Sequence, residues 1–196
     1  MVQFKDITVA ILAGGKSQRF GTEKAMASIG KHSLMEIAID LARKLAVHIF
    51  VIGDMKADRL PGDIAVHSDE MPGNGPLGGI HTALDHAITP YVFLLPCDMP
   101  LMIPDVYFKL ASYRWENQTV VAVSHTGLEP LVSLWPKDAL PIIERRLLAG
   151  RTSPIEALDE LHVLKVRMPE ALDSYHPDIF HNINTRRHLK LISKRQ

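Results

Sequence analysis

The 196-residue sequence contains a single cysteine, Cys97. One cysteine excludes an internal disulfide and a multi-cysteine zinc site, which fits a reducing compartment. The sequence also lacks any run of about 18 apolar residues, and its first short apolar stretch is interrupted by Lys5 and Asp6. These absences predict a cytoplasmic protein that does not act in a membrane.

The sequence also has no net formal charge, because 22 Lys and Arg residues balance 22 Asp and Glu residues. A broad nucleic-acid-binding surface needs a clustered basic excess, so we expect no nucleic acid among the partners. The 46% hydrophobic and 22% charged residues are typical of a globular protein. The length favours a single domain over residues 1–196 with room for a substantial core.

Short apolar runs with β-branched residues predict strands, and helical patterns lie between them. The predicted strands are Thr8 to Leu12, His48 to Ile52, Ala65 to His67, Tyr91 to Leu95, Thr119 to Val123, Leu131 to Trp135 and His162 to Val166. The predicted helices start at Ser33, which can form a capping box with Glu36, and otherwise cover 79–87, 105–115, 138–149, 154–161 and 186–194. Gly150 and Ser153 suit a C-cap and an N-cap. This alternation predicts an α/β fold with a mostly parallel sheet and a ligand crevice beyond the carboxyl ends of the strands.

The stretch LAGGKSQRFGTEK, residues 12–24, directly follows the first predicted strand. It is not a P-loop, because threonine rather than lysine follows its last glycine, and adjacent Gly14 and Gly15 do not fit G-x-G-x-x-G. Its glycines let main-chain N–H groups approach a phosphate, and Arg19 and Lys24 supply cationic groups. A surface turn with solvated charges is the alternative.

Asp98 follows the predicted strand in YVFLLPCDMP, between Pro96 and Pro100. Such an aspartate either caps a turn or binds a hard cation. The prolines restrict the loop, and Mg²⁺ needs only one or two protein carboxylates when a triphosphate supplies other ligands. The adjacent Cys97 is interpreted as a packing residue, since no oriented base is evident beside it.

Other polar residues stand near predicted strand ends. Asp69 begins the glycine-rich segment that leads to GPLGG, and Glu129 precedes a predicted strand in TGLEPLVSLW. Asn182 and Asn184 alternate, so on an extended segment their amides face one side, where they pair either with the donors and acceptors of a ligand or with loop backbone. The ten histidines show no metal-binding spacing and are interpreted as surface or packing residues.

Together these segments resemble the molybdenum cofactor guanylyltransferase family. The resemblance rests on its L-A-G-G-x-S-x-R-M-G-x-D-K loop, P-C-D-x-P, G-P-L-x-G, E-P-L and N-I-N-T elements, which occur here in the family's order. The chain departs from the family at Phe20 and Glu23, at Gly53 and Asp54 where an asparagine is usual, and at the basic residues 186–188.

The resemblance implies a three-layer, Rossmann-like nucleotidyltransferase fold with Mg²⁺ as cofactor. It implies transfer of GMP from GTP to the terminal phosphate of molybdopterin, giving molybdopterin guanine dinucleotide and pyrophosphate. Implied partner proteins are molybdenum cofactor biosynthesis proteins or apo-molybdoenzyme chaperones. The implied catalytic residues are Arg19, Lys24 and Asp98, of which Asp98 is the metal ligand. The implied GTP contacts are Leu12, Ala13, Gly14, Gly15, Lys24, Asp69 and Asp98, with 75–78 as loop scaffold, and the implied acceptor contacts are Glu129, Asn182 and Asn184.

Three alternatives stay open at this point. A molybdenum cofactor cytidylyltransferase would share the loop, although that relative tends toward L-A-A-G. A sugar-phosphate nucleotidyltransferase shares the fold and the metal chemistry but usually has a different opening loop. A non-catalytic nucleotide-binding regulator would keep Gly14 and Gly15 but would not need Asp98.

Overall fold

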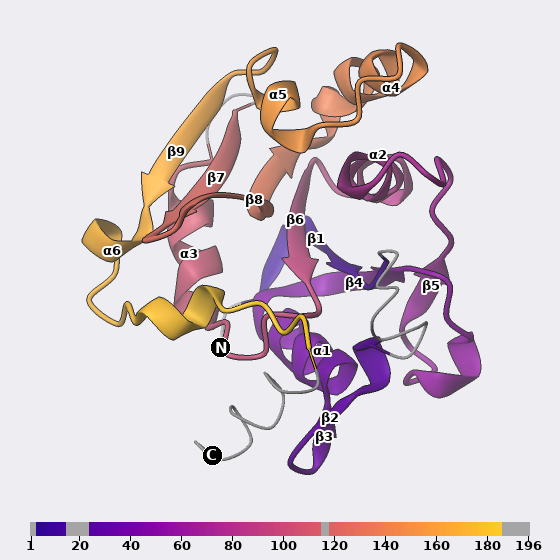
Figure 1. Cartoon of the computed structure of the whole chain (residues 1–196), viewed down its shortest axis with the longest axis vertical. Coiled ribbons are helices and arrows are strands. Elements are labelled where there is room, and N and C mark those ends of the chain that lie inside the picture. The colour runs from indigo at the N-terminus through magenta and orange to yellow at the C-terminus, as the bar shows by residue number, and fades with distance from the viewer. Residues whose placement is uncertain (1–2, 15–23, 115–117, 186–196) are drawn as a thin grey trace.

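The computed structural model describes residues 3–14, 24–114 and 118–185. A seven-stranded sheet crosses these residues in the order β5-β4-β1-β6-β8-β7-β9, and a two-stranded ribbon pairs β2 with β3 (Figure 1). The strands are β1 (Phe4–Leu12), β2 (Ser28–Ile29), β3 (His32–Ser33), β4 (Ala46–Ile52), β5 (Ala65–His67), β6 (Tyr91–Pro96), β7 (Thr119–Ser124), β8 (Gly127–Pro136) and β9 (Val163–Arg167). All seven predicted strands are present, most of them somewhat longer than predicted.

The predicted helices within the described residues are also present, with shifted ends. The α-helices are α1 (Leu34–Leu45), α2 (Pro76–His86), α3 (Pro104–Ser112), α4 (Leu140–Leu148), α5 (Pro154–Leu158) and α6 (Met168–Ala171), with short 3₁₀ turns at Lys24–Met26, Ala57–Arg59, Lys137–Ala139 and Pro177–Phe180. The predicted helix over 186–194 lies outside the described residues. No described helix has the length and apolar character that crossing a lipid bilayer requires.

Local capping explains where several helices begin and end. The predicted capping box at α1 is confirmed: the Glu36 amide donates to the Ser33 hydroxyl, and the Glu36 carboxylate accepts from the Ser33 amide. Gly150 ends α4 with a φ of 71°, and the N–H of Arg151 reaches back to the carbonyl of Arg146. Ser153 caps α5 as predicted.

The expected strand–helix alternation is wrong between β7 and β8. These strands form an antiparallel hairpin in which Ser124 pairs with Gly127 across a two-residue turn. β8 also runs antiparallel to β6, whereas β1, β4, β5 and β6 are parallel neighbours. The beginning of β8 is therefore brought to the edge where the parallel strands end.

Helices cover both faces of the sheet, which gives the predicted three layers (Figure 1). On β1, alternate residues Ile7, Val9 and Ile11 pack with α1 and α3, while Ala10 packs on the opposite face with α2, α4 and α5. The period of two within each strand supplies apolar side chains to both layers.

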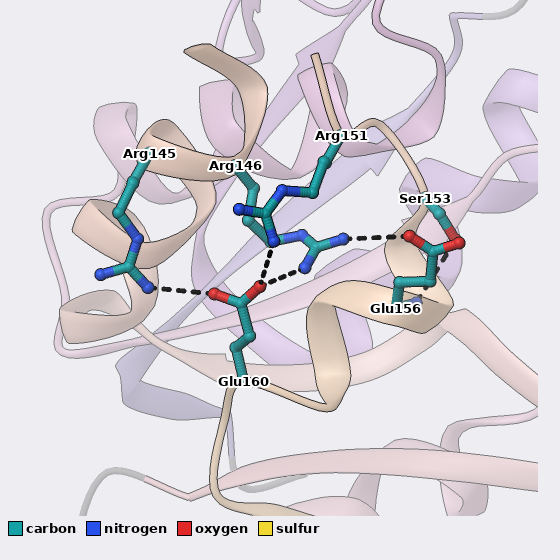
Figure 2. Close-up of polar contacts among 6 residues, drawn as sticks. All are labelled: Arg145, Arg146, Arg151, Ser153, Glu156 and Glu160. Atoms are coloured by element: carbon teal, nitrogen blue, oxygen red, sulfur yellow. Dashed lines mark hydrogen bonds and ion pairs between the residues drawn. The ribbon is translucent and has the colours of Figure 1, made fainter. Parts of the chain in front are cut away.

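Ion pairs connect α4 to α5 and to the residues that follow it. The buried Arg146 contacts both Glu156 and Glu160, and Arg145 and Arg151 also contact Glu160 (Figure 2). Three guanidinium groups converging on Glu160 lower the pKa of its carboxyl group.

Candidate functional site

Loops following the parallel strands meet at one edge of the sheet. β1, β4, β5 and β6 end there. Main-chain hydrogen bonds connect the residues that follow these strands to neighbouring strand ends. Ala13 donates its N–H to the carbonyl of Ile52 at 2.8 Å, and Cys97 donates to the carbonyl of Leu12 at 3.2 Å. This is the edge at which α/β folds bind ligands, as the sequence predicted.

Lys24 and Asp98 form the centre of the site. The Lys24 Nζ lies 2.7 Å from Asp98 Oδ2, and the two side chains are 17% and 25% exposed. The first belongs to the 3₁₀ turn after the opening loop and the second to the turn after β6. Segments 74 residues apart thus place a cation and a carboxylate in contact, within reach of solvent.

The segment with the two asparagines joins this pair. Asn184 Oδ1 accepts from Lys24 Nζ at 3.3 Å, and the Ile183 amide donates to the main-chain carbonyl of Asp98 at 2.8 Å. The Ile183 side chain is fully buried, whereas its neighbours Asn182 and Asn184 are half-buried and exposed. The burial of Ile183 between two less buried asparagines fits the predicted alternation, and Asn184 contacts the Lys24–Asp98 pair through Lys24.

Only part of the opening loop belongs to the described residues. Leu12 and Ala13 are half-buried and Gly14 is exposed, whereas Gly15 and Arg19 lie outside the described part of the chain. A side chain added at Gly53 would have its Cβ 3.2 Å from the Ala13 main chain. The loops after β1 and β4 therefore approach so closely that a larger residue at position 53 would displace Ala13.

Asp69 lies in the segment between β5 and α2. Its Oδ1 accepts the Met71 N–H at 3.0 Å, and a Cβ added at Gly78 would lie 3.0 Å from the same oxygen. The interpretation of 75–78 as loop scaffold is only partly correct. Gly75 caps the helix with a φ of 62°, but Pro76 already begins α2, because proline is well suited to a first helical turn.

Glu129 lies within β8 rather than ahead of it, which corrects the predicted strand start. Its carboxylate accepts from the hydroxyl of Ser124 at 2.8 Å and from that of Thr126 at 3.4 Å. Partial burial raises the pKa of Glu129 even though both hydroxyl groups favour the charged form. Sequence reasoning missed Ser124 and Thr126, although two hydroxyl residues around a hairpin turn were a usable signal.

Asp69 and Glu129 occupy the same sheet edge without joining the central pair. Among the contacts of the described residues, neither touches Lys24 or Asp98. The structure therefore brings together Lys24, Asp98 and Asn184, and among the described residues it places Leu12, Ala13, Gly14, Asp69 and Glu129 at the same edge of the sheet.

Cys97 is buried beside Asp98, and burial raises the pKa of its thiol to about 12. A protonated, inaccessible thiol cannot act as a nucleophile near neutral pH. Its position agrees with the predicted packing role.

This arrangement suits phosphate and hard-cation chemistry. Lys24 offers an ammonium group, and Asp98 offers a partly exposed carboxylate held by a turn between Pro96 and Pro100. One carboxylate fits Mg²⁺, which takes much of its coordination from substrate phosphates and water. The donor set thus has the composition expected for a Mg²⁺–nucleotide site.

Comparison with known proteins places the chain in a family. A family model described as "MobA-like NTP transferase domain" matches residues 9–162. The chain belongs to the MobA-like NTP transferase family. The match includes the opening loop, Asp69, Asp98 and Glu129, but ends before the Asn182–Asn184 segment.

Relatives in this family share most of the chain. A Vibrio cholerae protein named molybdenum cofactor guanylyltransferase is 30% identical, over 94% of this chain and 90% of its own length. A protein of the same name from Syntrophotalea carbinolica is 31% identical, over 91% and 87%. The crystal structure of molybdopterin-guanine dinucleotide biosynthesis protein A from Archaeoglobus fulgidus matches with a TM-score of 0.80 at 24% identity, over 95% and 97%. The predicted nucleotidyltransferase fold is confirmed.

Proposed function

We propose that this protein transfers GMP from GTP to the terminal phosphate of molybdopterin and releases pyrophosphate. The observation that carries the proposal is the Lys24–Asp98–Asn184 cluster at the carboxyl ends of the parallel strands. Family membership and the names of the relatives support nucleotidyl transfer, and guanylyl transfer in particular.

Lys24 and Asp98 have complementary tasks in the proposed reaction. In the nucleotide-free protein they neutralise each other across 2.7 Å. A triphosphate attracts the Lys24 ammonium group, which leaves Asp98 free to hold Mg²⁺. When bound, Mg²⁺ supplies positive charge to the nucleotide phosphates. Lys24, with Arg19 from the opening loop, then neutralises charge that develops toward pyrophosphate.

The acceptor needs positioning more than activation. A terminal phosphate is already anionic, so attack in line on the α-phosphorus needs no strong general base. Asn184, Asn182 and Glu129 are the proposed acceptor contacts, and Asn184 also reaches Lys24. This shared contact would place the attacking phosphate beside the group that holds the nucleotide.

The nucleotide contacts complete the proposal. Leu12 at the end of β1 and Ala13 and Gly14 directly after it are proposed to contact the nucleotide through their main chain, together with Gly15. Asp69, in the segment between β5 and α2, is a further proposed contact. The product would then pass to molybdenum cofactor biosynthesis proteins or apo-molybdoenzyme chaperones, which remains a prediction.

A pyrophosphate-release assay with molybdopterin as acceptor tests the function. We expect turnover with GTP and Mg²⁺, much less with CTP or ATP, and loss of turnover when a chelator removes Mg²⁺. Faster turnover with CTP would instead identify a cytidylyltransferase, and absence of turnover with every nucleotide would favour the regulator.

Substitution of Asp98 tests the metal assignment. We expect Asp98→Asn to lower kcat by at least about 100-fold, since the amide carries no charge for the metal. The matched control is Asp63→Asn, which removes an exposed carboxylate paired with Arg43 and should leave turnover unchanged. Unchanged turnover in Asp98→Asn would contradict the assignment.

A further inference from the structure

A second group of ionisable side chains lies between β5 and the C-terminal end of α2. Glu70, Asp85 and His86 each direct one ligand atom toward the others, and these atoms lie within 4.8 Å of one another. None of the three has a task in the proposed reaction. The group joins the segment after β5 to the last turn of a helix.

The imidazole ring of His86 is held in place by other rings. It stacks on His67 with ring centroids 3.9 Å apart and an interplanar angle of 24°, and the Phe50 ring packs edge-on against both. In this orientation His86 Nε2 lies 2.7 Å from Glu70 Oε1. A ligand nitrogen whose ring is already fixed loses little freedom when it binds an ion.

The main chain of Glu70, which faces His86, is fixed as well. The Glu70 N–H donates to the Thr82 hydroxyl at 3.1 Å, and that hydroxyl donates to the Gly78 carbonyl at 3.1 Å. Glu70 is therefore attached to α2 one turn before Asp85 and His86. The C-terminal end of a helix and two carboxylates both favour a cation at this position.

We propose that Glu70, Asp85 and His86 bind a divalent transition-metal ion of the Zn²⁺ class. One imidazole nitrogen with two carboxylate oxygens suits Zn²⁺ better than Mg²⁺ or Ca²⁺, which prefer all-oxygen sites. Ligands at roughly 2.0–2.2 Å from one ion lie about 3 Å or more apart, so the exposed Glu70 carboxylate moves outward by a few tenths of an ångström. The ion replaces the His86–Glu70 hydrogen bond and ties the Glu70 segment to α2.

Equilibrium dialysis of the full chain against Zn²⁺, with and without excess Mg²⁺, tests this inference. We expect saturable binding of one ion that Mg²⁺ does not displace, and a rise in the melting temperature on Zn²⁺ addition. His86→Ala and Glu70→Gln should each weaken binding by at least about tenfold and remove the rise in melting temperature.

A second histidine–carboxylate pair provides the matched control. The exposed His176 has its Nδ1 3.6 Å from Asp178 Oδ2. His176→Ala should leave Zn²⁺ binding and the melting-temperature shift unchanged. The inference is overturned if binding is not saturable, if His86→Ala binds like the parent, or if His176→Ala loses binding equally. It does not rest on the proposed function, because its readouts are binding and stability.

Discussion

The Lys24 ammonium group lies between two oxygens that come from different parts of the chain. Asp98 supplies charge, and Asn184 supplies a directional acceptor at 3.3 Å. A partly exposed ion pair adds little to stability, because water screens it and two long side chains must be ordered. The contacts therefore matter mainly for where the ammonium group is held.

The contribution of the Asn184 amide can be tested by substitution. Asn184→Ala should weaken GTP binding in the presence of Mg²⁺ about three- to tenfold, the range expected for one lost hydrogen bond. Isothermal titration without acceptor measures this effect separately from acceptor binding. Asn182→Ala is the control, and equal GTP affinity in both variants would show that Asn184 does not position Lys24.

The second prediction concerns Glu129, whose pKa is raised by burial. A raised pKa in the folded state means that the native protein holds this proton more tightly than the unfolded chain. The stabilisation is complete below the unfolded pKa and is lost as pH rises through the folded pKa. Side-chain NMR titration should give a pKa above the ordinary range for a glutamate.

A glutamine at this position provides the comparison. The parent should lose stability between pH 4 and pH 7, whereas Glu129→Gln should not. The stability of Glu129→Gln relative to the parent, measured by urea denaturation, should therefore increase over this range. A difference that does not change with pH would show that Glu129 has an ordinary pKa.

At the scale of elements, the first turn of α2 lies close to the Asp69 segment. A Cβ on Gly78 would lie 2.7 Å from the Met71 carbonyl oxygen, closer than real side chains come, whereas one on Gly79 would make an ordinary 3.6 Å contact with Leu12. Two adjacent helical glycines thus differ in what surrounds them.

This difference predicts opposite results for the same substitution. Gly78→Ala should displace Met71 and Asp69 and raise the KM for GTP several-fold. Gly79→Ala should leave KM unchanged and stabilise the protein by up to about 1 kcal/mol, because alanine favours a helix. Kinetic assays and urea denaturation of both variants provide the test, and equal KM values would contradict the proposed part of Asp69 in GTP binding.

The α4–α5 connection permits a second prediction at this scale. Arg146 is 4% exposed and contacts two glutamates, whereas Arg145 is 67% exposed and contacts one (Figure 2). Arg146→Ala should lower the unfolding free energy by about 2–3 kcal/mol, since it removes both ion pairs and leaves a cavity. Arg145→Ala should lower it by less than about 0.5 kcal/mol. Urea denaturation distinguishes them, and equal losses would show that the ion pairs of the buried Arg146 do not hold α5 to α4.

At the scale of the whole molecule, the last described segment closes the site across the sheet edge. Ile183 packs with Ile29 and Leu34, while its N–H bonds to the Asp98 carbonyl. Residues from early, middle and late parts of the described chain therefore meet at one place.

We predict that the packing of Ile183 supports activity as well as stability. Ile183→Ala should cost about 2–4 kcal/mol of unfolding free energy and lower turnover, because the segment that carries Asn184 loses its anchor. Ile183→Val should cost about 1 kcal/mol and keep turnover near the parent level. Turnover is measured well below the melting temperature of each variant, so that unfolding does not mimic the loss. Full activity in folded Ile183→Ala would show that the segment is held elsewhere.

Much of the fold was predictable because its signals are local. Each strand carries its own apolar run, and Ser33 with Glu36 specifies the start of α1 within four residues. The order of these elements predicted the layers and the edge at which Asp98 would lie. The hairpin between β7 and β8 was not predicted, because the spacing between two strands in the sequence does not show whether they pair in parallel or antiparallel. The start of α2 at Pro76 was not predicted either, because it depends on the backbone conformation of Gly75, which caps the helix.

The sequence by itself determined the α/β class, since strand and helix patterns follow from residue types at short spacing. It also predicted phosphate binding by the opening loop and a metal-binding role for Asp98, and both stay predictions. Only the tertiary structure decided that Asn184 reaches Lys24, that Ser124 and Thr126 hold Glu129, and that Glu70 lies beside His86. These contacts join residues through the sheet register and the packing of helices on its faces. Such distances are set by many weak contacts together, so no local pattern encodes them.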